Sequence, residues 1–504
     1  MTIAIQFLGA VETVTGSQYL VTAGERRILV DCGFFQGSPN EVARNRMPFA
    51  YEARSVDAVL LTHAHLDHCG RIPSLVKAGF SGPIHATPGT LDLTEIVLRD
   101  AAKLQEEAEA RWRRHHPEPA DTSDEETAVE RDDAGMPARL RQANPEAMTM
   151  SRAALYHPAD VDATVRLFRP VQYEETLQVA PGITARFHDA GHILGSAIIE
   201  LTVTDGEVAT TIVFSGDLGR CDTPILRDPT PISHADFVLI ESTYGNREHG
   251  PMAQAVEDLA AAVSEVAGGR GVLLVPSFAI GRTQEVVWEL DRLLRDGRIP
   301  RLPLFLDSPM ASRASDVYLR HPEDYDEETA ALLRSGGSPL EYPGEEFTND
   351  AQQSKAIRTQ PRPFMVVASS GMLTGGRILH HLKDFLPDPA SMLLFIGYQG
   401  QGSLGFAIQH GAKEARIDGQ MYPVRCKVRS ISGFSAHADE HELEDWVRNF
   451  AGAGGAAAAN GRPKTVFVVH GDPDAASAFA DRIRGELGLE VQLPSYLQQV
   501  VLRP

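Results

Sequence analysis

The sequence has few cysteines and no long apolar run. Four cysteines stand singly in 504 residues, at Cys32, Cys69, Cys221 and Cys426. This pattern excludes a disulfide framework and a Cys-x-x-Cys metal knuckle. No segment reaches the roughly 20 consecutive apolar residues of a membrane helix, and the early apolar stretch from Ile3 to Val14 lacks the basic leader of a signal peptide. We therefore expect a soluble, cytoplasmic protein with reduced cysteines and no contact with a membrane.

The sequence also lacks an excess of positive charge. Its formal net charge is −21 at pH 7, which argues against a protein that coats nucleic acid non-specifically, because phosphate binding needs positive potential. Part of this charge is local, since eight acids and one base between Glu118 and Gly135 leave a surplus of seven negative charges. We expect a disordered surface insertion over residues 117 to about 148, because this segment has almost nothing apolar to bury.

The first half of the chain alternates short apolar runs with turns. Such runs occupy residues 3–8, 18–21, 27–30, 58–62, 184–187, 198–202, 211–214 and 237–240. Their length and spacing predict strands of a sheet.

After Tyr244 the pattern changes to alternating helix and strand. Helical patterns at 253–266 and 283–294 alternate with apolar runs at 271–276, 303–306, 364–368 and 393–396. This order predicts a mainly parallel sheet covered by helices. We therefore expect an α/β protein in which one domain is split by another, with residues 1–244 and 427–504 forming the first domain and residues 245–426 the inserted one.

The strongest functional signal is a histidine cluster that directly follows an apolar strand. His63, His65, Asp67 and His68 lie within six residues. Three imidazoles and a carboxylate so close in sequence converge where a chain turns at a strand end and a rigid sheet supports them. The alternative is a solvated polar loop, but His is uncommon and this spacing is specific. The cluster therefore predicts a metal site.

Four further residues stand at or just beyond the ends of apolar strands: His192, Asp217, His437 and His470. Each alone is a weak signal, because a single His after a strand more often packs or caps. Together with the first cluster they form an ordered series along the chain.

This series resembles the metallo-β-lactamase superfamily and, within it, the β-CASP branch of nucleic-acid hydrolases. The resemblance covers nearly the whole chain and includes the long insertion after Asp217, Glu241 in the segment 240–245, and the run Ser369-Ser370-Gly371. It implies a metallo-β-lactamase αββα sandwich, interrupted by an inserted α/β β-CASP domain with a mainly parallel sheet.

The resemblance also implies two Zn²⁺ per chain. One would be held by His63, His65 and His192, the other by Asp67, His68 and His470, and Asp217 would bridge them. Two zincs about 3.5–4 Å apart lower the pKa of a shared water and clamp a phosphate during in-line attack.

One more carboxylate, Asp31, follows the strand at 27–30. The resemblance makes it a group that orients the metal site. The alternative, an Asp that caps the tight turn before Gly33, stays open.

The catalytic set that the resemblance implies consists of Asp67, His437 and Glu241. His437 would act as general acid for the departing alkoxide, and Glu241, together with the sequence neighbour Asp439, could keep its imidazole protonated. The alternative role for His437 is a hydrogen bond to a metal ligand.

Substrate binding is expected at a glycine-rich turn from Gly371 to Arg377 that opens a helix at Ile378. Backbone N–H groups at such a turn can hold a phosphate. The candidate contacts are Arg282, Ser369, Ser370, Gly371 and Arg377.

The implied function is hydrolysis of RNA, with single-stranded RNA as partner and a homodimer as a candidate assembly. The chain ends soon after His470 and lacks the extra domain of the ribonuclease J group, so it resembles the polyadenylation-type endonucleases and their prokaryotic relatives. One alternative is a small-molecule ester or thioester hydrolase of the superfamily, which has no use for the inserted domain. Another is a catalytically silent RNA-processing scaffold, which is expected to have lost ligands. Discrimination against DNA depends on contacts to the 2′-OH, which no motif displays.

Overall fold

The computed structural model describes residues 1–115, 153–348, 350–397, 399–400, 402–451 and 462–503. The surface insertion expected over residues 117–148 lies outside this part of the chain.

Two seven-stranded sheets form a sandwich. The first has the strand order β22-β1-β2-β3-β4-β5-β6, with bounds Gln499–Leu502, Ile3–Gly9, Gln18–Ala23, Arg26–Val30, Ala58–Leu60, Ile84–Ala86 and Phe168–Pro170. The second has the order β21-β20-β11-β10-β9-β8-β7, with bounds Val491–Gln492, Thr465–Val468, Phe237–Ile240, Val208–Phe214, Ala197–Asp205, Ile183–Asp189 and Thr176–Ala180. The apolar runs of the first half of the sequence are therefore strands, as predicted.

The two sheets share one apolar core. Ile3, Ile5 and Phe7 of β1 point into it, and the Phe7 ring lies 5.2 Å from that of Phe467 on β20, centroid to centroid. Leu8 of the same strand joins a second core on the outer face of its sheet. Because side chains alternate along a strand and both faces are covered, these strands read as nearly continuous apolar runs.

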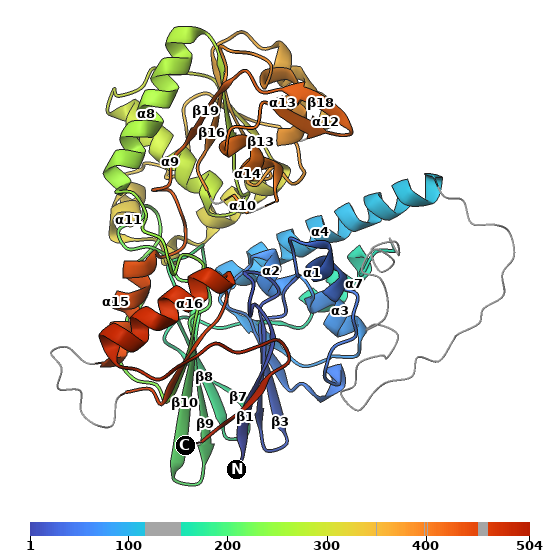
Figure 1. Ribbon diagram of the computed structural model, residues 1–504, viewed down its shortest axis with the longest axis vertical. Coiled ribbons are helices and arrows are strands. Elements are labelled where there is room, and N and C mark those ends of the chain that lie inside the picture. The colour runs from blue at the N-terminus through green and yellow to red at the C-terminus, as the bar shows by residue number, and fades with distance from the viewer. Residues whose placement is uncertain (116–152, 349, 398, 401, 452–461, 504) are drawn as a thin grey trace, which may run out of the picture.

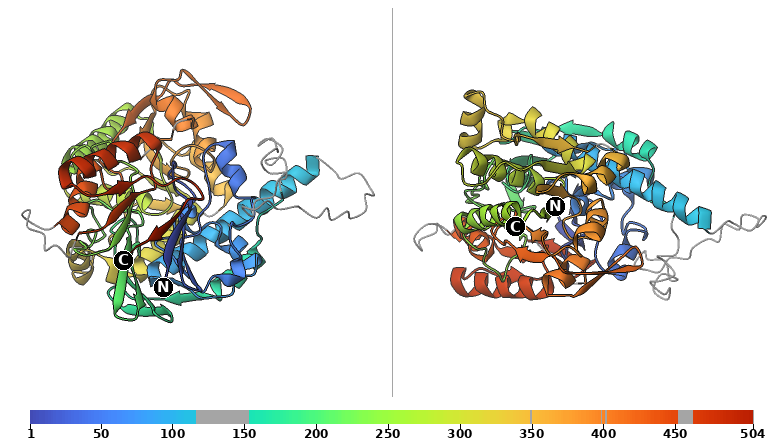
Figure 2. Two further views of the ribbon diagram at one scale, coloured as in Figure 1. Left: turned by 60° about the horizontal axis from the view of Figure 1, so that its bottom comes forward. Right: turned by 90° about the horizontal axis from the view of Figure 1, so that it is seen from above.

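Helices cover both outer faces of the sandwich (Figure 1). On the first sheet pack α2, α3, α4 and α7, with bounds Leu66–Cys69, Ile72–Lys77, Pro88–His115 and Pro158–Val165. On the second pack α15 and α16, with bounds Glu440–Ala451 and Pro473–Arg482. The layers follow the predicted αββα order. Helix α4 projects well beyond the body of the molecule, as Figure 1 and Figure 2 both show.

A third sheet lies in the inserted domain, above the sandwich in Figure 1. Its strand order is β14-β13-β15-β12-β16-β19, with bounds Glu345–Phe347, Leu304–Asp307, Phe364–Ala368, Val272–Pro276, Met392–Phe395 and Lys427–Ser430. All neighbouring strands in it are parallel, as the alternating pattern predicts.

Helices also cover both faces of this parallel sheet. One face carries α8 and α9, Met252–Gly269 and Arg282–Arg295, and the other carries α13 and α14, Ile378–Phe385 and Leu404–Gln409. Helices α10, α11 and α12 span Pro309–Arg320, Glu327–Arg334 and Ala351–Ala356, and a hairpin pairs β17 with β18, Glu414–Ile417 with Gln420–Pro423. None of the described helices combines the length and the apolar character that crossing a membrane requires.

One expected boundary needs correction. The sequence places residue 427 at the return to the first domain, but β19, which begins there, pairs with β16 along the edge of the parallel sheet. The chain therefore leaves the inserted sheet only after Ser430. The short run of β19 carries no signal that assigns it to one sheet or the other.

The inserted domain joins the sandwich at one edge. Strands β10, β11 and β20 are mutually parallel neighbours, and so are β3 and β4. The carboxyl ends of β10, β11 and β20 therefore lie at one edge of the second sheet, from which the chain leaves after β11 and to which it returns before α15.

Candidate metal centre and active site

The predicted metal ligands come from four segments of the sandwich. His63 follows β4 by three residues, and His65, Asp67 and His68 belong to the short turn and helix α2. The other three are His192 in the β8–β9 loop, Asp217 after β10 and His470 after β20. The structure brings all seven together.

The first group consists of His63, His65, His192 and Asp217. Nδ1 of His65 lies 3.1 Å from Nε2 of His63 and 3.2 Å from Nε2 of His192. Oδ2 of Asp217 lies 3.5 Å from Nε2 of His63 and 3.7 Å from that of His192. Two nitrogens bound to one tetrahedral zinc about 2.0–2.1 Å away stand about 3.3 Å apart, so this spacing fits one metal ion.

The second group consists of Asp67, His68 and His470. Nε2 of His68 lies 3.2 Å from Nε2 of His470, which lies 3.7 Å from Oδ2 of Asp67. Oδ1 of Asp217 faces this group, 3.3 Å from Nε2 of His68 and 3.5 Å from Nδ1 of His470. Asp217 therefore directs one carboxylate oxygen toward each group.

The donor set fits bound cations. Oδ1 of Asp217 is buried and has no well-aligned hydrogen-bond partner among the described residues. A buried carboxylate oxygen without a donor is costly unless a cation compensates it. This oxygen, which lacks a well-aligned hydrogen bond, and the converging imidazoles together indicate metal binding at this place.

Burial sets the protonation of the first group. It lowers the pKa of His65 to about 4 and holds the pKa values of His63 and His192 well below their ordinary value. These imidazoles are therefore neutral at pH 7, which is the form that binds a metal.

Carboxylates outweigh burial in the second group. Burial opposes the charged form of His68, but Asp217 and Asp31 hold its pKa well above the ordinary value. The pKa of His470 is raised in the same way by Asp217 and Asp67, against burial. Metal ions and protons therefore compete for these two imidazoles.

Hydrogen bonds from outside the ligand set fix the rings. Nδ1 of His68 lies 2.7 Å from Oδ2 of Asp31, which also accepts hydrogen bonds from the hydroxyls of Ser17 and Thr62 at 3.1 and 2.9 Å. Asp31 thus orients a ligand, as the resemblance implies. A hydroxyl also meets a ligand in the second group, where Oγ1 of Thr243 lies 3.2 Å from Nδ1 of His470.

The predicted general acid stands beside the metal groups. Nδ1 of His437 lies 3.1 Å from Oε1 of Glu241 and 4.0 Å from Oδ2 of Asp217. Burial lowers the pKa of His437, but the Glu241 carboxylate outweighs it and raises the pKa to about 9. Glu241 is fully buried and accepts hydrogen bonds from the backbone N–H groups of Leu218 and Thr243, at 2.7 and 3.2 Å.

His249 supports the His437 segment, and the sequence carries no signal for it. Its Nε2 lies 3.1 Å from the carbonyl oxygen of His437, and its ring packs edge-on against Tyr244 with centroids 4.4 Å apart. Asp439 does not reach the His437 ring through any described contact. It accepts hydrogen bonds from the backbone N–H groups of His441 and Glu442 at the start of α15, and from that of His249 before α8. The expectation that Asp439 supports the imidazole directly is therefore wrong.

The expected phosphate turn lies at the carboxyl end of β15 and opens α13, as predicted. Oγ of Ser369 lies 2.9 Å from Oγ of Ser308, while Oγ of Ser370 accepts a hydrogen bond from Thr374 N at 3.0 Å. The carbonyl of Gly371 accepts a hydrogen bond from Nε2 of Gln399 at 2.9 Å. The turn is thus held by its own domain, and its contact with a phosphate stays a prediction.

The two predicted arginine clamps already have acidic partners. Arg377 is half-buried and forms an ion pair with Asp307 at 2.6 Å. Arg282 is 5% exposed and pairs with Glu285 one turn further along α9. Their role in substrate binding also stays a prediction.

Asp307 is a buried residue that was not among the predicted site residues. Besides Arg377 it meets Nε2 of His381 at 2.6 Å and the hydroxyls of Ser354 and Thr348. Burial raises the pKa of its carboxyl, but these hydrogen bonds and the ion pair hold it well below its ordinary value. The sequence offers a signal for this residue, because Asp307 is the last residue of an apolar strand and Asp31 directly follows one.

Three family models match successive parts of the chain. The model of the metallo-beta-lactamase superfamily matches residues 11–238, that of the Beta-Casp domain matches residues 283–408, and that of the Zn-dependent metallo-hydrolase RNA specificity domain matches residues 421–494. Together they follow the order of the sandwich, the inserted domain and the returning segment.

Similar proteins span nearly the whole chain. A ribonuclease of Thermus thermophilus is 38% identical over 488 residues, which cover 97% of each chain. Transcription termination factor FttA of Methanosarcina mazei is 30% identical over 511 residues, which cover 99% of this chain and 72% of that protein. A crystal structure of a protein of unknown function from Enterococcus faecalis aligns over the full length of both chains with a TM-score of 0.51 and 12% identity, a likeness of fold alone.

Proposed function

Because the chain belongs to the β-CASP family of hydrolases with the metallo-β-lactamase fold, we propose that it is a metal-dependent ribonuclease whose proton donor is His437. The family models and the 38% identical relative confirm the family that the motif series resembles. RNA as the substrate is supported by the ribonuclease and the termination factor among its relatives.

The proposed cofactor is two Zn²⁺ per chain. His63, His65 and His192 would hold one, Asp67, His68 and His470 the other, and Asp217 would contact both. Bound there, the ions would lower the pKa of a shared water toward neutrality and hold the scissile phosphate. Oδ1 and Oδ2 of Asp217 face different groups of imidazoles, which supports the bridging role.

The residues of the chain supply the proton and the orientation. Nδ1 of His437 is engaged by Glu241, so Nε2 is the nitrogen that would donate a proton to the leaving oxygen of the phosphodiester. Glu241 is itself fixed by two backbone N–H groups. Asp31 would keep the His68 ring in its ligand orientation through the hydrogen bond to Nδ1.

The single observation that carries the proposal is the His437–Glu241 pair, 3.1 Å apart beside the ligand groups. The proposed metal binding would need neither residue, because the seven proposed ligands form two groups without them. A proton donor at this place suits a poor leaving group such as a ribose oxygen. A small-molecule ester or thioester hydrolase has less need of it, and a silent scaffold has no reason to keep all seven ligands.

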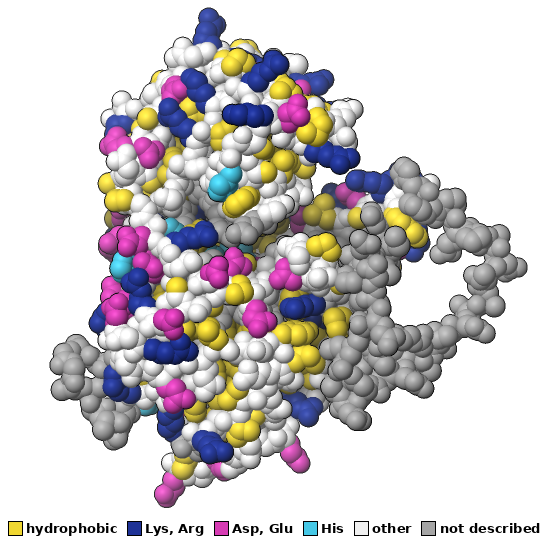
Figure 3. Space-filling model, in the orientation of Figure 1, with side chains coloured by type: hydrophobic (Ala, Val, Ile, Leu, Met, Phe, Trp, Pro, Cys, Tyr) yellow, Lys and Arg dark blue, Asp and Glu magenta, His cyan; other side chains and the backbone are white. Residues whose placement is uncertain are grey.

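We further propose internal cleavage of single-stranded RNA. An unpaired strand can follow the hollow that Figure 3 shows between the inserted domain and the sandwich. Lys and Arg side chains are scattered over this face rather than gathered in one patch, so phosphate contacts are expected close to the metal centre. The candidates are Arg282, Ser369, Ser370, Gly371 and Arg377.

The test uses matched RNA and DNA oligomers of one sequence, labelled at the 5′ or the 3′ end. The zinc-loaded protein is expected to cut RNA internally, so that both labels report the same sites. Activity should disappear with a chelator and return with Zn²⁺. Hydrolysis of small esters without cleavage of RNA would overturn the proposal, and equal cleavage of DNA would reassign the substrate.

A further inference from the structure

Phe278 exposes an aromatic ring among buried neighbours. It follows β12 by two residues, and 39% of its surface is accessible, whereas Ser277, Ala279 and Ile280 are 1%, 5% and 5% exposed. Single exposed apolar residues are common. The position of this one at the carboxyl edge of the parallel sheet, beside Gly371 of the expected phosphate turn, gives it a specific meaning.

The backbone that carries Phe278 is firmly held. Its carbonyl oxygen accepts hydrogen bonds from the hydroxyl and the N–H of Thr283, at 2.7 and 3.3 Å. The carbonyl of Ala279 accepts one from Nε2 of the buried Gln284 at 3.2 Å. The first turn of α9 therefore fixes the loop, and the ring is presented from a rigid support.

The ring lies against the glycine of the expected phosphate turn. A Cβ added to Gly371 would stand 2.9 Å and 3.0 Å from two ring carbons of Phe278, which is closer than side chains tolerate. A Cβ on Gly397 would stand 3.9 Å from the same edge of the ring. The main chain at these two glycines therefore comes close to one edge of the ring, and 39% of the Phe278 surface stays accessible.

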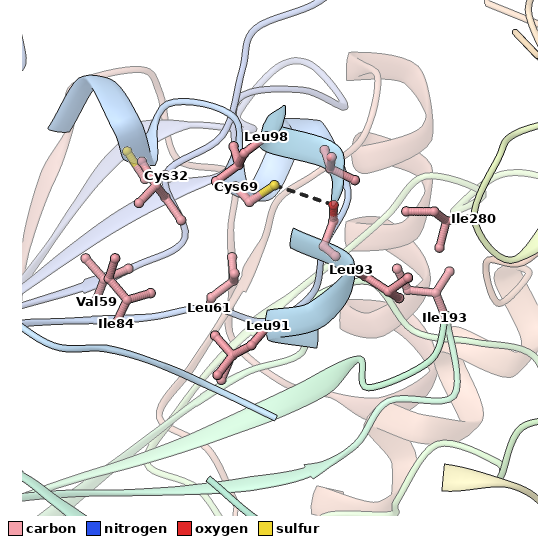
Figure 4. Packing of buried hydrophobic residues seen from close by; sticks show 14 of the residues in the cluster. Cys32, Val59, Leu61, Cys69, Ile84, Leu91, Leu93, Leu98, Ile193 and Ile280 are labelled. Atoms are coloured by element: carbon pink, nitrogen blue, oxygen red, sulfur yellow. Dashed lines mark hydrogen bonds between the residues drawn. The ribbon is translucent and has the colours of Figure 1, made fainter. Parts of the chain in front are cut away.

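The same loop contacts the metal-binding segment. Ile280 belongs to one apolar cluster with Ile193, the residue after His192, and Figure 4 shows both side chains in it. A Cβ on Gly281 would stand 2.9 Å from Cγ2 of Ile193. The Phe278 loop is therefore packed against the segment that carries a proposed metal ligand.

We propose that Phe278 is a stacking platform for one base of the RNA strand that is bound at the metal centre. The inference rests on the proposed function and names a substrate contact for it. Bases of a single strand are unpaired and offer their faces to aromatic rings, and such stacking tolerates any base. A rigid ring beside a turn suited to a phosphate matches the two parts of a nucleotide.

The test compares Phe278→Leu with Phe347→Leu. Phe347 has the same 39% exposure but ends β14, three strands and about 14 Å across the same sheet. Dissociation constants are measured for a phosphorothioate RNA oligomer that resists cleavage, and for a set in which each base in turn is replaced by an abasic residue. Phe278→Leu is expected to weaken binding about tenfold, Phe278→Tyr to restore it, and Phe347→Leu to leave it unchanged.

One abasic position should weaken binding to the unchanged protein by the same factor and have no further effect in Phe278→Leu. Additive losses at every position would overturn the stacking assignment. So would equal weakening by Phe347→Leu, which indicates a general loss of apolar surface. If the protein cleaves RNA but the losses from the abasic position and from Phe278→Leu are additive, only the stacking role of Phe278 is refuted. If the effects of the abasic position and of Phe278→Leu on binding are coupled but no RNA is cleaved, the stacking role of Phe278 is supported and the proposed ribonuclease activity is refuted.

Discussion

Nδ1 of His437 lies 3.1 Å from Oε1 of Glu241, a residue 196 positions earlier in the chain. Glu241 follows β11, where the chain leaves the sandwich for the inserted domain, and His437 precedes α15, where it returns. The whole inserted domain therefore lies between the two partners. The position of the proposed proton donor consequently depends on that domain being folded and docked.

Replacement of Asp217 should remove both metal ions together. Its two oxygens face different ligand groups, so Asp217→Ala is expected to lower the metal content from two per chain to less than one. Metal analysis after gel filtration measures this, with Asp316→Ala on the exposed face of α10 as control. Retention of two ions, or one tightly held ion in the unchanged protein, contradicts the bridging role.

The pH dependence of stability should report on Asp307. Its folded-state pKa lies below the unfolded value, so the carboxylate stabilises the fold above the unfolded pKa of about 4, and this contribution is lost as pH falls toward the folded value. Asp307→Asn should cost about 3 kcal/mol at pH 7, and the difference from the unchanged protein should shrink below pH 4. Urea denaturation across this range measures it, with Asp316→Asn as control. A difference independent of pH would show that the charge of Asp307 is not what stabilises the fold.

Salt dependence should reveal whether Arg377 binds phosphate. If it contacts one phosphate, Arg377→Ala weakens RNA binding and reduces the slope of log Kd against log salt by about one. Arg334→Ala, on an exposed face of α11, is the matched control. An unchanged slope for Arg377→Ala would limit this arginine to its ion pair with Asp307.

The layers of the fold were open to prediction because they depend on local pattern, whereas the two metal groups are what the family resemblance implies. Each ligand follows an apolar strand or sits in a glycine-rich turn, and carboxyl ends of parallel neighbours meet at one edge. Local pattern does not bring His63 and His470 together, because β4 and β20 lie in different sheets, and their joint place among the metal ligands is what the resemblance implies.

The contacts that depend on distant partners could not be predicted. Nothing near Arg377 in sequence indicates that Asp307 would hold it, and nothing near His249 indicates a contact with the carbonyl of His437. Asp439 has the opposite difficulty. Its closeness to His437 in sequence suggests a direct contact with the imidazole. An Asp just before a helix, however, more readily accepts hydrogen bonds from the first backbone N–H groups of that helix than from the side chain of a residue before it.

The proposed role of His437 as proton donor would distinguish this enzyme from the small-molecule hydrolases of its superfamily. Its contact with Glu241 leaves both ligand groups complete, so His437→Ala should keep its metal and lose roughly 10²–10⁴ in turnover of RNA, the usual scale for a positioned proton donor.

The reason for that loss can be isolated with the leaving group. The nitrophenolate of a nitrophenyl phosphodiester is a good leaving group and departs without a proton. Because His437→Ala removes only proton donation, its defect in turnover should shrink on this substrate. His470→Ala is the control, since His470 faces Asp217 and His68 within 3.5 Å, and it should lose metal and fail on both substrates. Steady-state turnover on the two substrates, with metal content measured on the same samples, separates the cases. Loss of metal from His437→Ala would make it a structural residue of the site, and equal impairment on both substrates would leave it without a role in proton transfer.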